Sequence, residues 1–360
     1  FGRRGYYNSQ EIGLGRALAR KGHEVMIYKG IDPSEKEEKV QVEKNLTIWY
    51  LPMKHLGAHG FMDCKYLDPQ LKALFCFGDQ QIFLPHVYRW CRRRRIPFVA
   101  YVGTAHSLDS NFKSKVMNAL FAAGTLRIYK KNPVLAKTSA AKEELRQLGV
   151  PHAVIAPVGL DNAVLKKNIP ADEKMRLRKE HGFEADDVIL CNVSRLSWEK
   201  RPLELIDLFL QVKGKKKFKL IIVGNGPLEE ELNEKIRKNG LEKEVKIYPN
   251  VPYEKMWEIY EMSDYYLNMN KGEIFGMAIM EAVYYKTSVA AIRALGPSVT
   301  LKDMKGHKLC ENDDEMAEWI TGPYPSEKDL QESSEKMAAT FTWDRCADAF
   351  LQASSEKSSR

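Results

Sequence analysis

Short apolar runs alternate with segments whose apolar residues recur at helical spacing along most of this chain. The apolar runs of the first half are predicted strands, at residues 24–28, 46–52, 73–78, 98–103 and 134–137. A second series of predicted strands covers residues 188–194, 219–224, 245–249 and 264–270. Strands that alternate with amphipathic helices are typical of α/β proteins with parallel sheets.

The predicted helices between these strands support the same fold class. Residues 9–20 predict a helix for which Asn8 is a capping residue, and Leu228, Leu232 and Ile236 form an apolar stripe at helical spacing. A polar stretch at 162–174 without clear periodicity predicts a linker. Because 360 residues exceed one ordinary core, we expect domains at 1–160 and 161–340, followed by a C-terminal helix and polar tail at 341–360.

Composition excludes several classes of protein. Hydrophobic residues make up 44% of the chain and charged residues 29%, as in globular proteins. The sequence shows neither an apolar run of the ~20 residues that span a bilayer nor a signal-peptide apolar region. Its six cysteines are scattered without a C-x-x-C spacing, which predicts reduced thiols rather than a zinc site or disulfides. We therefore expect a cytoplasmic protein.

Charge is divided unevenly along the chain. Residues 1–160 hold 25 Lys and Arg against 13 Asp and Glu, a balance of +12, and the remainder holds 31 against 35. The densest basic cluster lies beside Tyr88 and Trp90. It comprises Arg89, Arg92, Arg93, Arg94 and Arg95. An anionic membrane surface attracts such a cluster, and so does nucleic acid, although basic residues also stabilise an ordinary helix C-terminus. Of these we expect peripheral membrane contact and no nucleic acid.

The second half carries groups suited to a phosphorylated ligand. Arg195 and Lys200 follow a predicted strand, at whose carboxyl edge ligands bind in open α/β sheets. Two cations there suit a diphosphate. Gly224 and Gly226 predict a tight turn before a helix that begins at Pro227. Segment 248–256, with Val251, is expected to contact a nucleobase through backbone groups.

The segment GEIFGMAIMEA places Glu273 and Glu281 on either side of Phe275-Gly276. A helix that begins near Met277 would direct N–H groups at an anion. Glu273, before the helix, would then contact sugar hydroxyls, and Glu281, one turn in, would accept hydrogen bonds from ribose hydroxyls. The alternative is a loop and amphipathic helix with two ordinary surface glutamates, because short motifs often match by chance.

Taken together, these motifs make the C-terminal half resemble the nucleotide-binding half of the GT-B retaining glycosyltransferases of family 4 (glycosyl transferases group 1). The family's R-L-x-x-E-K, V-G-x-G-P and E-x-F-G-x-x-x-x-E patterns match residues 195–200, 223–227 and 273–281. Segments 6–25 and 136–161 resemble parts of the family's first domain, and the region around Trp343 resembles its final helix.

The resemblance implies two Rossmann-like domains that face each other across a cleft, with a C-terminal helix that returns to the first. It implies a hexosyltransferase that moves a hexose-type sugar with retention, without metal or cofactor, from a nucleotide sugar, with a UDP-sugar favoured over a GDP-sugar. The product would belong to surface or envelope glycan synthesis, on a glycan or lipid-linked acceptor. The donor contacts implied are Arg195, Lys200, Gly224, Gly226, Val251, Glu273, Phe275, Gly276, Met277, Ala278 and Glu281, with Glu273 also catalytic.

Two departures from the family pattern concern the first half. Many relatives carry a histidine where this chain has Val102, and His106 four residues later is a candidate catalytic substitute or an ordinary loop histidine. Relatives also begin with an apolar strand, whereas this sequence opens at Phe1, so that strand is either trimmed or missing.

The acceptor is expected on the basic first domain, which suits an anionic acceptor. The candidate residues are Arg3, Arg4, Tyr6, Tyr7, Asn8 and Thr104. The protein would then lie on the cytoplasmic membrane face. Two alternatives remain open: a sugar-nucleotide epimerase or phosphorylase of the same fold, and a non-catalytic protein that binds sugar nucleotides or nucleic acid.

Overall fold

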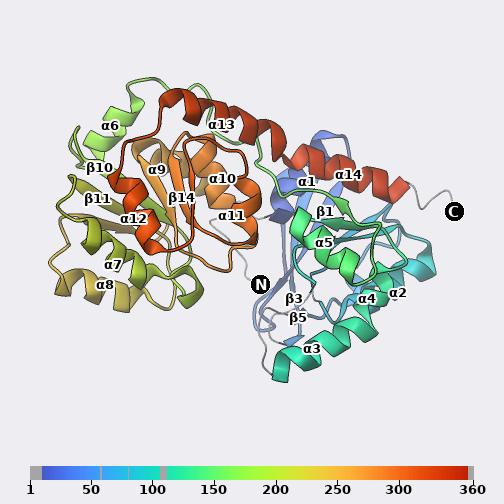
Figure 1. The fold of residues 1–360 in the computed structure, drawn as a ribbon. Helices are drawn as coiled ribbons and strands as arrows, with labels where there is room; N and C mark the ends of the chain where they lie inside the picture. Colours follow the sequence, from blue (N-terminus) through green and yellow to red (C-terminus); the bar gives the residue numbers. More distant parts are fainter. Residues whose placement is uncertain (1–9, 57–58, 80, 106–111, 356–360) are drawn as a thin grey trace. The chain divides into compact units, whose positions relative to one another are not determined.

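The chain forms two compact units in the computed structural model, which describes residues 10–56, 59–79, 81–105 and 112–355 (Figure 1). One unit contains residues 1–159 and 342–360, and the other contains residues 160–341. The chain therefore passes between the units twice. We call them unit 1 and unit 2.

Unit 1 is built on two sheets. A four-stranded parallel sheet has the order β6-β7-β8-β9, and a three-stranded sheet has the order β1-β3-β2, in which β2 is antiparallel to β3. The strands are β1 Val25–Ile31, β2 Glu38–Glu43, β3 Leu46–Pro52, β6 Leu74–Phe77, β7 Phe98–Val102, β8 Val134–Ala136 and β9 Val154–Ile155, with a short hairpin of β4 His55–Leu56 and β5 His59–Gly60. All five residues of β7 are buried, because it lies inside the sheet.

Helices surround these sheets. They are α1 Gln10–Arg20, α2 Leu84–Arg94, α3 Phe112–Ala123, α4 Thr125–Tyr129 and α5 Ser139–Gln147, with the 3₁₀ turn η1 Cys64–Tyr66. The C-terminal helix α14, Trp343–Ser355, also belongs to unit 1, where it packs on α1. Trp343 is fully buried, and a Cβ at Gly13 of α1 would lie 2.1 Å from its Nε1 atom. The predicted return of the last helix to the first domain is confirmed.

Unit 2 contains a six-stranded, entirely parallel sheet of order β12-β11-β10-β13-β14-β15. Its strands are β10 Val188–Val193, β11 Phe218–Val223, β12 Val245–Tyr248, β13 Tyr265–Asn268, β14 Ser288–Ile292 and β15 Lys308–Cys310. In chain order this is 3-2-1-4-5-6, the doubly wound arrangement, whose order reverses between β10 and β13. Ligands of such sheets bind at the carboxyl ends of the strands beside this reversal.

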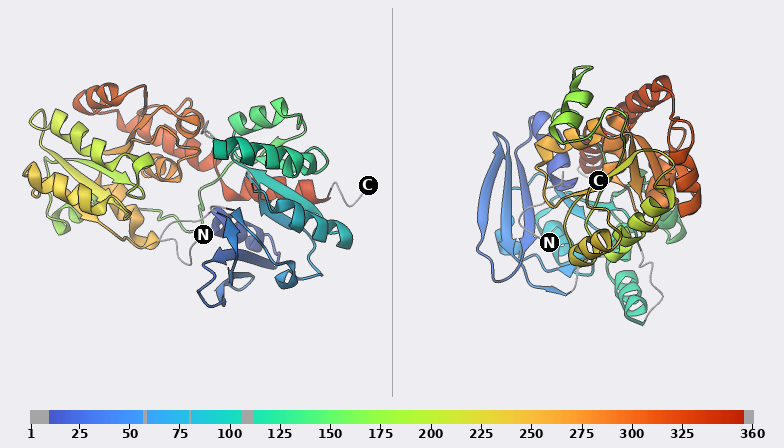
Figure 2. Two further views of the ribbon diagram at one scale, coloured as in Figure 1. Left: turned by 90° about the horizontal axis from the view of Figure 1, so that it is seen from below. Right: turned by 90° about the vertical axis from the view of Figure 1, so that its left-hand side faces the viewer.

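Helices cover both faces of the sheet in unit 2, as the turned views show (Figure 2). Helices α7, α8 and α12 are neighbours, as are α6, α9 and α10, and α10 packs on α13. The bounds are α6 Glu173–Glu180, η2 Trp198–Lys200, α7 Pro202–Val212, α8 Glu229–Lys238, η3 Tyr253–Lys255, α9 Met256–Met262, α10 Met277–Tyr284, α11 Leu295–Thr300, α12 Asp313–Thr321 and α13 Glu327–Thr340. None of the helices in the described part of the chain has the length and apolar character to cross a membrane.

One predicted boundary is wrong. Helix α8 begins at Glu229 rather than at Pro227. The Leu228 N–H donates to the Leu196 carbonyl at 3.0 Å, and the Glu229 N–H donates to the Gly226 carbonyl at 3.1 Å. These bonds hold Pro227 in a turn, so the helix starts two residues later.

Candidate donor-nucleotide site

The carboxyl ends of β10 and β13 bring together two of the predicted site residues. The Lys200 Nζ atom lies 2.8 Å from the Glu273 Oε2 atom, although 73 residues separate them. The Asn270 side chain donates to the same Oε2 atom at 3.1 Å. Its own Oδ1 accepts from the Gly272 N–H at 2.9 Å, which fixes the loop after β13. Lysine, asparagine and glutamate thus form one polar cluster at the reversal of strand order.

The environment of Glu273 keeps its carboxyl ionised. Burial by itself raises the pKa of this group, but the charge of Lys200 and hydrogen bonds from Lys200 and Asn270 outweigh burial and leave the pKa below its usual value. A fixed carboxylate of this kind accepts hydrogen bonds from hydroxyl groups.

Glu281 lies in a different environment, although it belongs to the same motif. Its residue is 6% exposed, on the inner side of α10, and its Oε2 atom accepts from the Tyr260 hydroxyl at 2.9 Å. Burial raises the pKa of Glu281 to about 7, against hydrogen bonds from Tyr260 and Tyr253 that lower it. The alternative of a surface glutamate is therefore wrong for Glu281.

The start of α10 is shaped by Gly276. This residue has a φ of +84°, a left-handed conformation that side chains other than glycine rarely adopt, and α10 begins at Met277 directly after it. The first N–H groups of a helix have no acceptor within it, so those of Met277 and Ala278 are available to an anion. The predicted helix start is confirmed, while Phe275 is a buried side chain packed near Phe341.

The glycine turn after β11 is a close approach of two backbones. A Cβ at Gly224 would lie 1.9 Å from the Ser194 carbonyl oxygen, and one at Gly226 would lie 2.4 Å from that of Leu196. The Leu196 N–H donates to the Asn225 carbonyl at 2.8 Å. These contacts hold the segment after β10 against the turn, so the backbone around Arg195 is fixed.

The Arg195 side chain itself is exposed to solvent. It is 65% exposed, and its Nη2 atom lies 2.6 Å from the Glu199 Oε1 atom. Sequence reasoning placed Arg195 and Lys200 together on a diphosphate. The structure pairs them with different carboxylates, Glu199 and Glu273.

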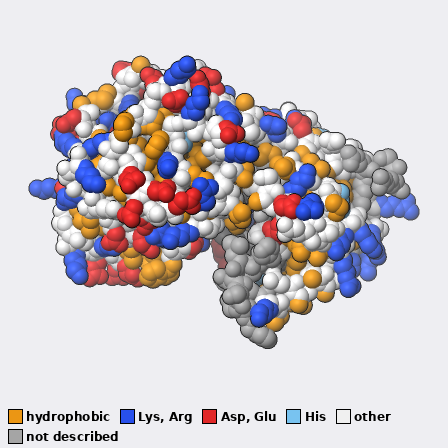
Figure 3. All heavy atoms as spheres, in the orientation of Figure 1, with side chains coloured by type: hydrophobic (Ala, Val, Ile, Leu, Met, Phe, Trp, Pro, Cys, Tyr) orange, Lys and Arg blue, Asp and Glu red, His pale blue; other side chains and the backbone are white. Residues whose placement is uncertain are grey.

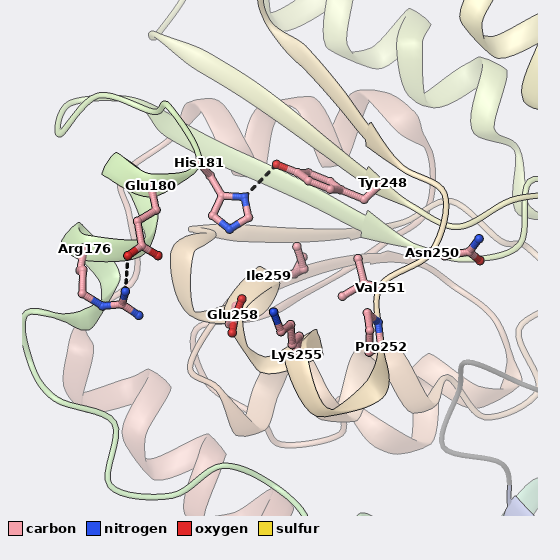
Figure 4. Close-up of a pocket in the computed structure, with 10 residues that line it drawn as sticks. All are labelled: Arg176, Glu180, His181, Tyr248, Asn250, Val251, Pro252, Lys255, Glu258 and Ile259. Carbon is pink, nitrogen blue, oxygen red and sulfur yellow. Dashed lines mark hydrogen bonds and ion pairs between the residues drawn. The ribbon is translucent and has the colours of Figure 1, made fainter.

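A cavity of about 460 Å³ lies beside the segment predicted to contact a nucleobase (Figure 4). Val251 lines it, and so do His181 and Tyr248, whose Nδ1 and Oη atoms are 2.9 Å apart. The other lining residues are Arg176, Glu180, Asn250, Pro252, Lys255, Glu258 and Ile259. Sequence reasoning missed His181 because it lies directly after α6, more than sixty residues before Tyr248 in the chain.

Few of the candidates in the first half can be placed. Arg3, Arg4, Tyr6, Tyr7, Asn8 and His106 lie outside the described residues. Thr104 follows β7, and Val102, at the place of the relatives' histidine, is buried in the core of unit 1.

Two polar residues near Thr104 were missed by sequence reasoning. Asp79 follows β6 and Lys137 follows β8, with the Lys137 Nζ and Asp79 Oδ2 atoms 3.5 Å apart. The Gly103 N–H donates to Asp79 Oδ1 at 2.6 Å. Their positions just after β6 and β8, the two parallel strands that flank β7, were the available signal.

Comparison with known proteins adds an independent line of evidence. Residues 173–336 match the family described as glycosyl transferases group 1. A D-inositol 3-phosphate glycosyltransferase from Xylanimonas cellulosilytica is 22% identical, over 99% of this chain and 93% of its own. An alpha-monoglucosyldiacylglycerol synthase from Acholeplasma laidlawii is 20% identical, over 76% of this chain and 73% of its own. The crystal structure of Anabaena Alr3699/HepE in complex with UDP superposes with a TM-score of 0.66 at 18% identity, and covers 80% of this chain and 79% of that one.

These similarities agree with the doubly wound sheet of unit 2 and the polar cluster at its strand ends. The chain has the GT-B fold and is a glycosyltransferase, and its residues 173–336 match the group 1 family. The fold class and the enzyme class expected from the sequence are confirmed.

Proposed function

We propose that this glycosyltransferase moves a hexose-type sugar from a nucleotide sugar, with UDP as the favoured carrier, without a metal and with retention of configuration. The observation that carries this proposal is the Lys200–Glu273 pair at the reversal of strand order, with the buried Glu281 eight residues further along the chain in α10. The UDP bound in the Anabaena neighbour supports a uridine nucleotide donor.

The roles we assign follow the chemistry of each group. Lys200, Arg195 and the first N–H groups of α10 neutralise the diphosphate as it leaves, which is stabilisation by fixed charges and dipoles. Glu273 accepts from hydroxyls of the donor sugar, and Glu281 accepts from the ribose. Val251 and its neighbours contact the base through the backbone.

We also propose that unit 1 lies on an anionic membrane surface and takes a glycan or lipid-linked acceptor there. Arg92, Arg93, Arg94 and Arg95 are all exposed at the end of α2, and basic side chains gather over this part of the surface in Figure 3. Val116 and Leu120 are exposed on α3 with Lys115. Exposed apolar and basic side chains together suit the headgroup region of a bilayer. The lipid product named for the Acholeplasma relative supports a lipid-linked acceptor.

The donor assignment is tested by thermal unfolding with UDP, GDP, ADP and their glucose or mannose conjugates. A ligand that binds the native state raises its unfolding temperature, so we expect the largest rise with UDP compounds. A larger rise in unfolding temperature with GDP or ADP compounds would contradict the uridine donor. The protein would still be a glycosyltransferase with a nucleotide-sugar donor. The absence of any rise across the series would contradict a nucleotide-sugar donor.

A further inference from the structure

Tyr260 connects α9 to the carboxyl group of Glu281 on α10. Its hydroxyl donates to the Glu281 Oε2 atom at 2.9 Å, and both residues are nearly completely buried. A carboxylate offers about four acceptor positions on its two oxygens, so the hydrogen bonds from Tyr260 and Tyr253 leave further positions free.

The Tyr260 ring is held by contacts that do not involve Glu281. It stacks on the Tyr285 ring, with centroids 5.9 Å apart and planes at 10°. The Tyr285 hydroxyl is itself fixed, since it accepts from the Lys166 N–H at 3.0 Å. The Tyr260 carbonyl accepts from the Thr287 hydroxyl at 2.9 Å. Tyr260 is therefore a fixed donor to which the Glu281 carboxylate must adjust.

We propose that Tyr260 is a positioning residue of the nucleotide site, whose hydroxyl binds Oε2 of Glu281 and so holds the carboxylate where its remaining acceptor positions can receive a ribose hydroxyl of a nucleoside diphosphate. This inference rests on the proposed function, in which Glu281 contacts the ribose. Tyr260 acts through Glu281, since its own hydroxyl is occupied by the carboxylate. Such a supporting hydrogen bond holds a binding group in its productive rotamer.

The same contact affects the charge of Glu281. In the described part of the chain, the groups that face this carboxyl are Tyr253 of η3, Tyr260 of α9, Tyr266 of β13 and Tyr285 at the end of α10. Burial raises the pKa of Glu281 to about 7, and hydrogen bonds from Tyr260 and Tyr253 oppose this rise. Below this pH the carboxyl is protonated and accepts less well from ribose hydroxyls. Nucleotide affinity should therefore increase as the pH rises through 7.

Removal of the Tyr260 hydroxyl should shift this dependence to higher pH, because the ionised carboxyl loses a donor. The test is calorimetric titration of UDP into the wild type and Tyr260→Phe at half-unit steps from pH 6 to 9. We expect affinity about ten-fold below wild type at pH 7, because hydrogen bonds to charged groups are among the stronger ones. We expect this difference in UDP affinity between the wild type and Tyr260→Phe to shrink towards pH 9. Ionisation of the UDP phosphate is common to all variants and cancels in their ratio.

Two further variants complete the test. Tyr265→Phe is the matched control, since Tyr265 is a buried tyrosine of β13 whose hydroxyl has no hydrogen-bond partner among the described residues, and it should keep the wild-type pH profile. Glu281→Gln should weaken UDP binding. It should also remove the pH dependence of UDP affinity that Tyr260→Phe shifts to higher pH. Thermal unfolding of each variant shows that it is folded.

The possible results separate the inference from the proposed function. If Glu281→Gln weakens UDP binding but Tyr260→Phe keeps the wild-type affinity and pH profile, Tyr260 has no positioning role and the donor site stands. A loss of UDP affinity in Tyr260→Phe that is equal at every pH would also overturn the inference, since such a loss would reflect changed packing alone. If Glu281→Gln leaves UDP affinity unchanged, the assignment of Glu281 to the ribose is wrong, and the inference is wrong with it.

Discussion

At the scale of single residues, the two glutamates of one short motif are placed in opposite electrostatic environments. Glu273 has a lysine and an amide as partners, which outweigh its burial, whereas Glu281 has tyrosine hydroxyls, which do not. Pairs of titratable groups whose surroundings push their pKa values apart are characteristic of functional sites. In the sequence motif both positions are glutamate, so the motif does not distinguish their environments.

Lys200→Ala should destabilise the protein, and more so at neutral than at acid pH. The pKa of Glu273 is lowered in the fold, so the pair contributes stability that is present above the unfolded-state pKa and lost as the pH falls through the folded one. Without Lys200, burial dominates, and ionised Glu273 becomes unfavourable. We expect a loss of about 2 kcal/mol at pH 7, measured by urea unfolding, and a clearly smaller loss at pH 4.

Arg293→Ala is the control for this experiment. Its pair with Glu311 is about half exposed on both sides, so its loss should cost less than about 0.5 kcal/mol at either pH. Equal losses for the Lys200 and Arg293 variants would mean that Lys200 contributes no more than a surface charge.

At the scale of helices and strands, the sequence predicted what depends on local pattern. Nine predicted strands are present to within about three residues, because each is a compact apolar run. Strands β2 and β15 were missed: β2 is an edge strand whose sequence EKVQVE is half charged, and β15 has only three residues. Strand β14, SVAAI, was missed because its small residues carry little apolar signal, although it lies inside the sheet and is fully buried.

The candidate site was predictable to the extent that it lies in short motifs. Lys200 and Glu273 come from separate motifs, and their contact depends on the parallel pairing of β10 with β13, which no local pattern contains. Tyr260 was missed for a similar reason: it lies 21 residues before Glu281 on another helix, and only the packing of α9 against α10 brings them together. In unit 2 the motif residues Lys200 and Glu273 were found, while the tyrosine that supports Glu281 from a neighbouring helix was not.

At the scale of the whole molecule, the uneven division of charge gives unit 1 a property of its own. Residues 1–160 carry a balance of +12 while the remainder carries −4. Each basic residue near an anionic bilayer contributes roughly 1 kcal/mol, and salt screens this attraction. We therefore expect membrane binding that depends on lipid charge and ionic strength.

Co-sedimentation with vesicles checks this expectation. The protein should bind vesicles that contain phosphatidylglycerol and not neutral ones, and the combined change Arg92→Gln, Arg93→Gln and Arg95→Gln should weaken binding at least about ten-fold. The control removes three exposed lysines of unit 2, with the changes Lys215→Gln, Lys238→Gln and Lys243→Gln, and so alters net charge equally. Equal binding to neutral and anionic vesicles at low salt would contradict the electrostatic account.

The central claim is that the strand ends of unit 2 hold a nucleotide sugar through Glu273 and Glu281 in different roles. Its most direct test is calorimetric titration of UDP into the wild type, Glu273→Ala and Glu281→Ala at pH 8, where Glu281 is ionised in the wild type. UDP carries the ribose but no sugar to transfer, so the account predicts at least ten-fold weaker binding for Glu281→Ala and near wild-type binding for Glu273→Ala. Unchanged UDP affinity in the Glu281→Ala variant would contradict the account.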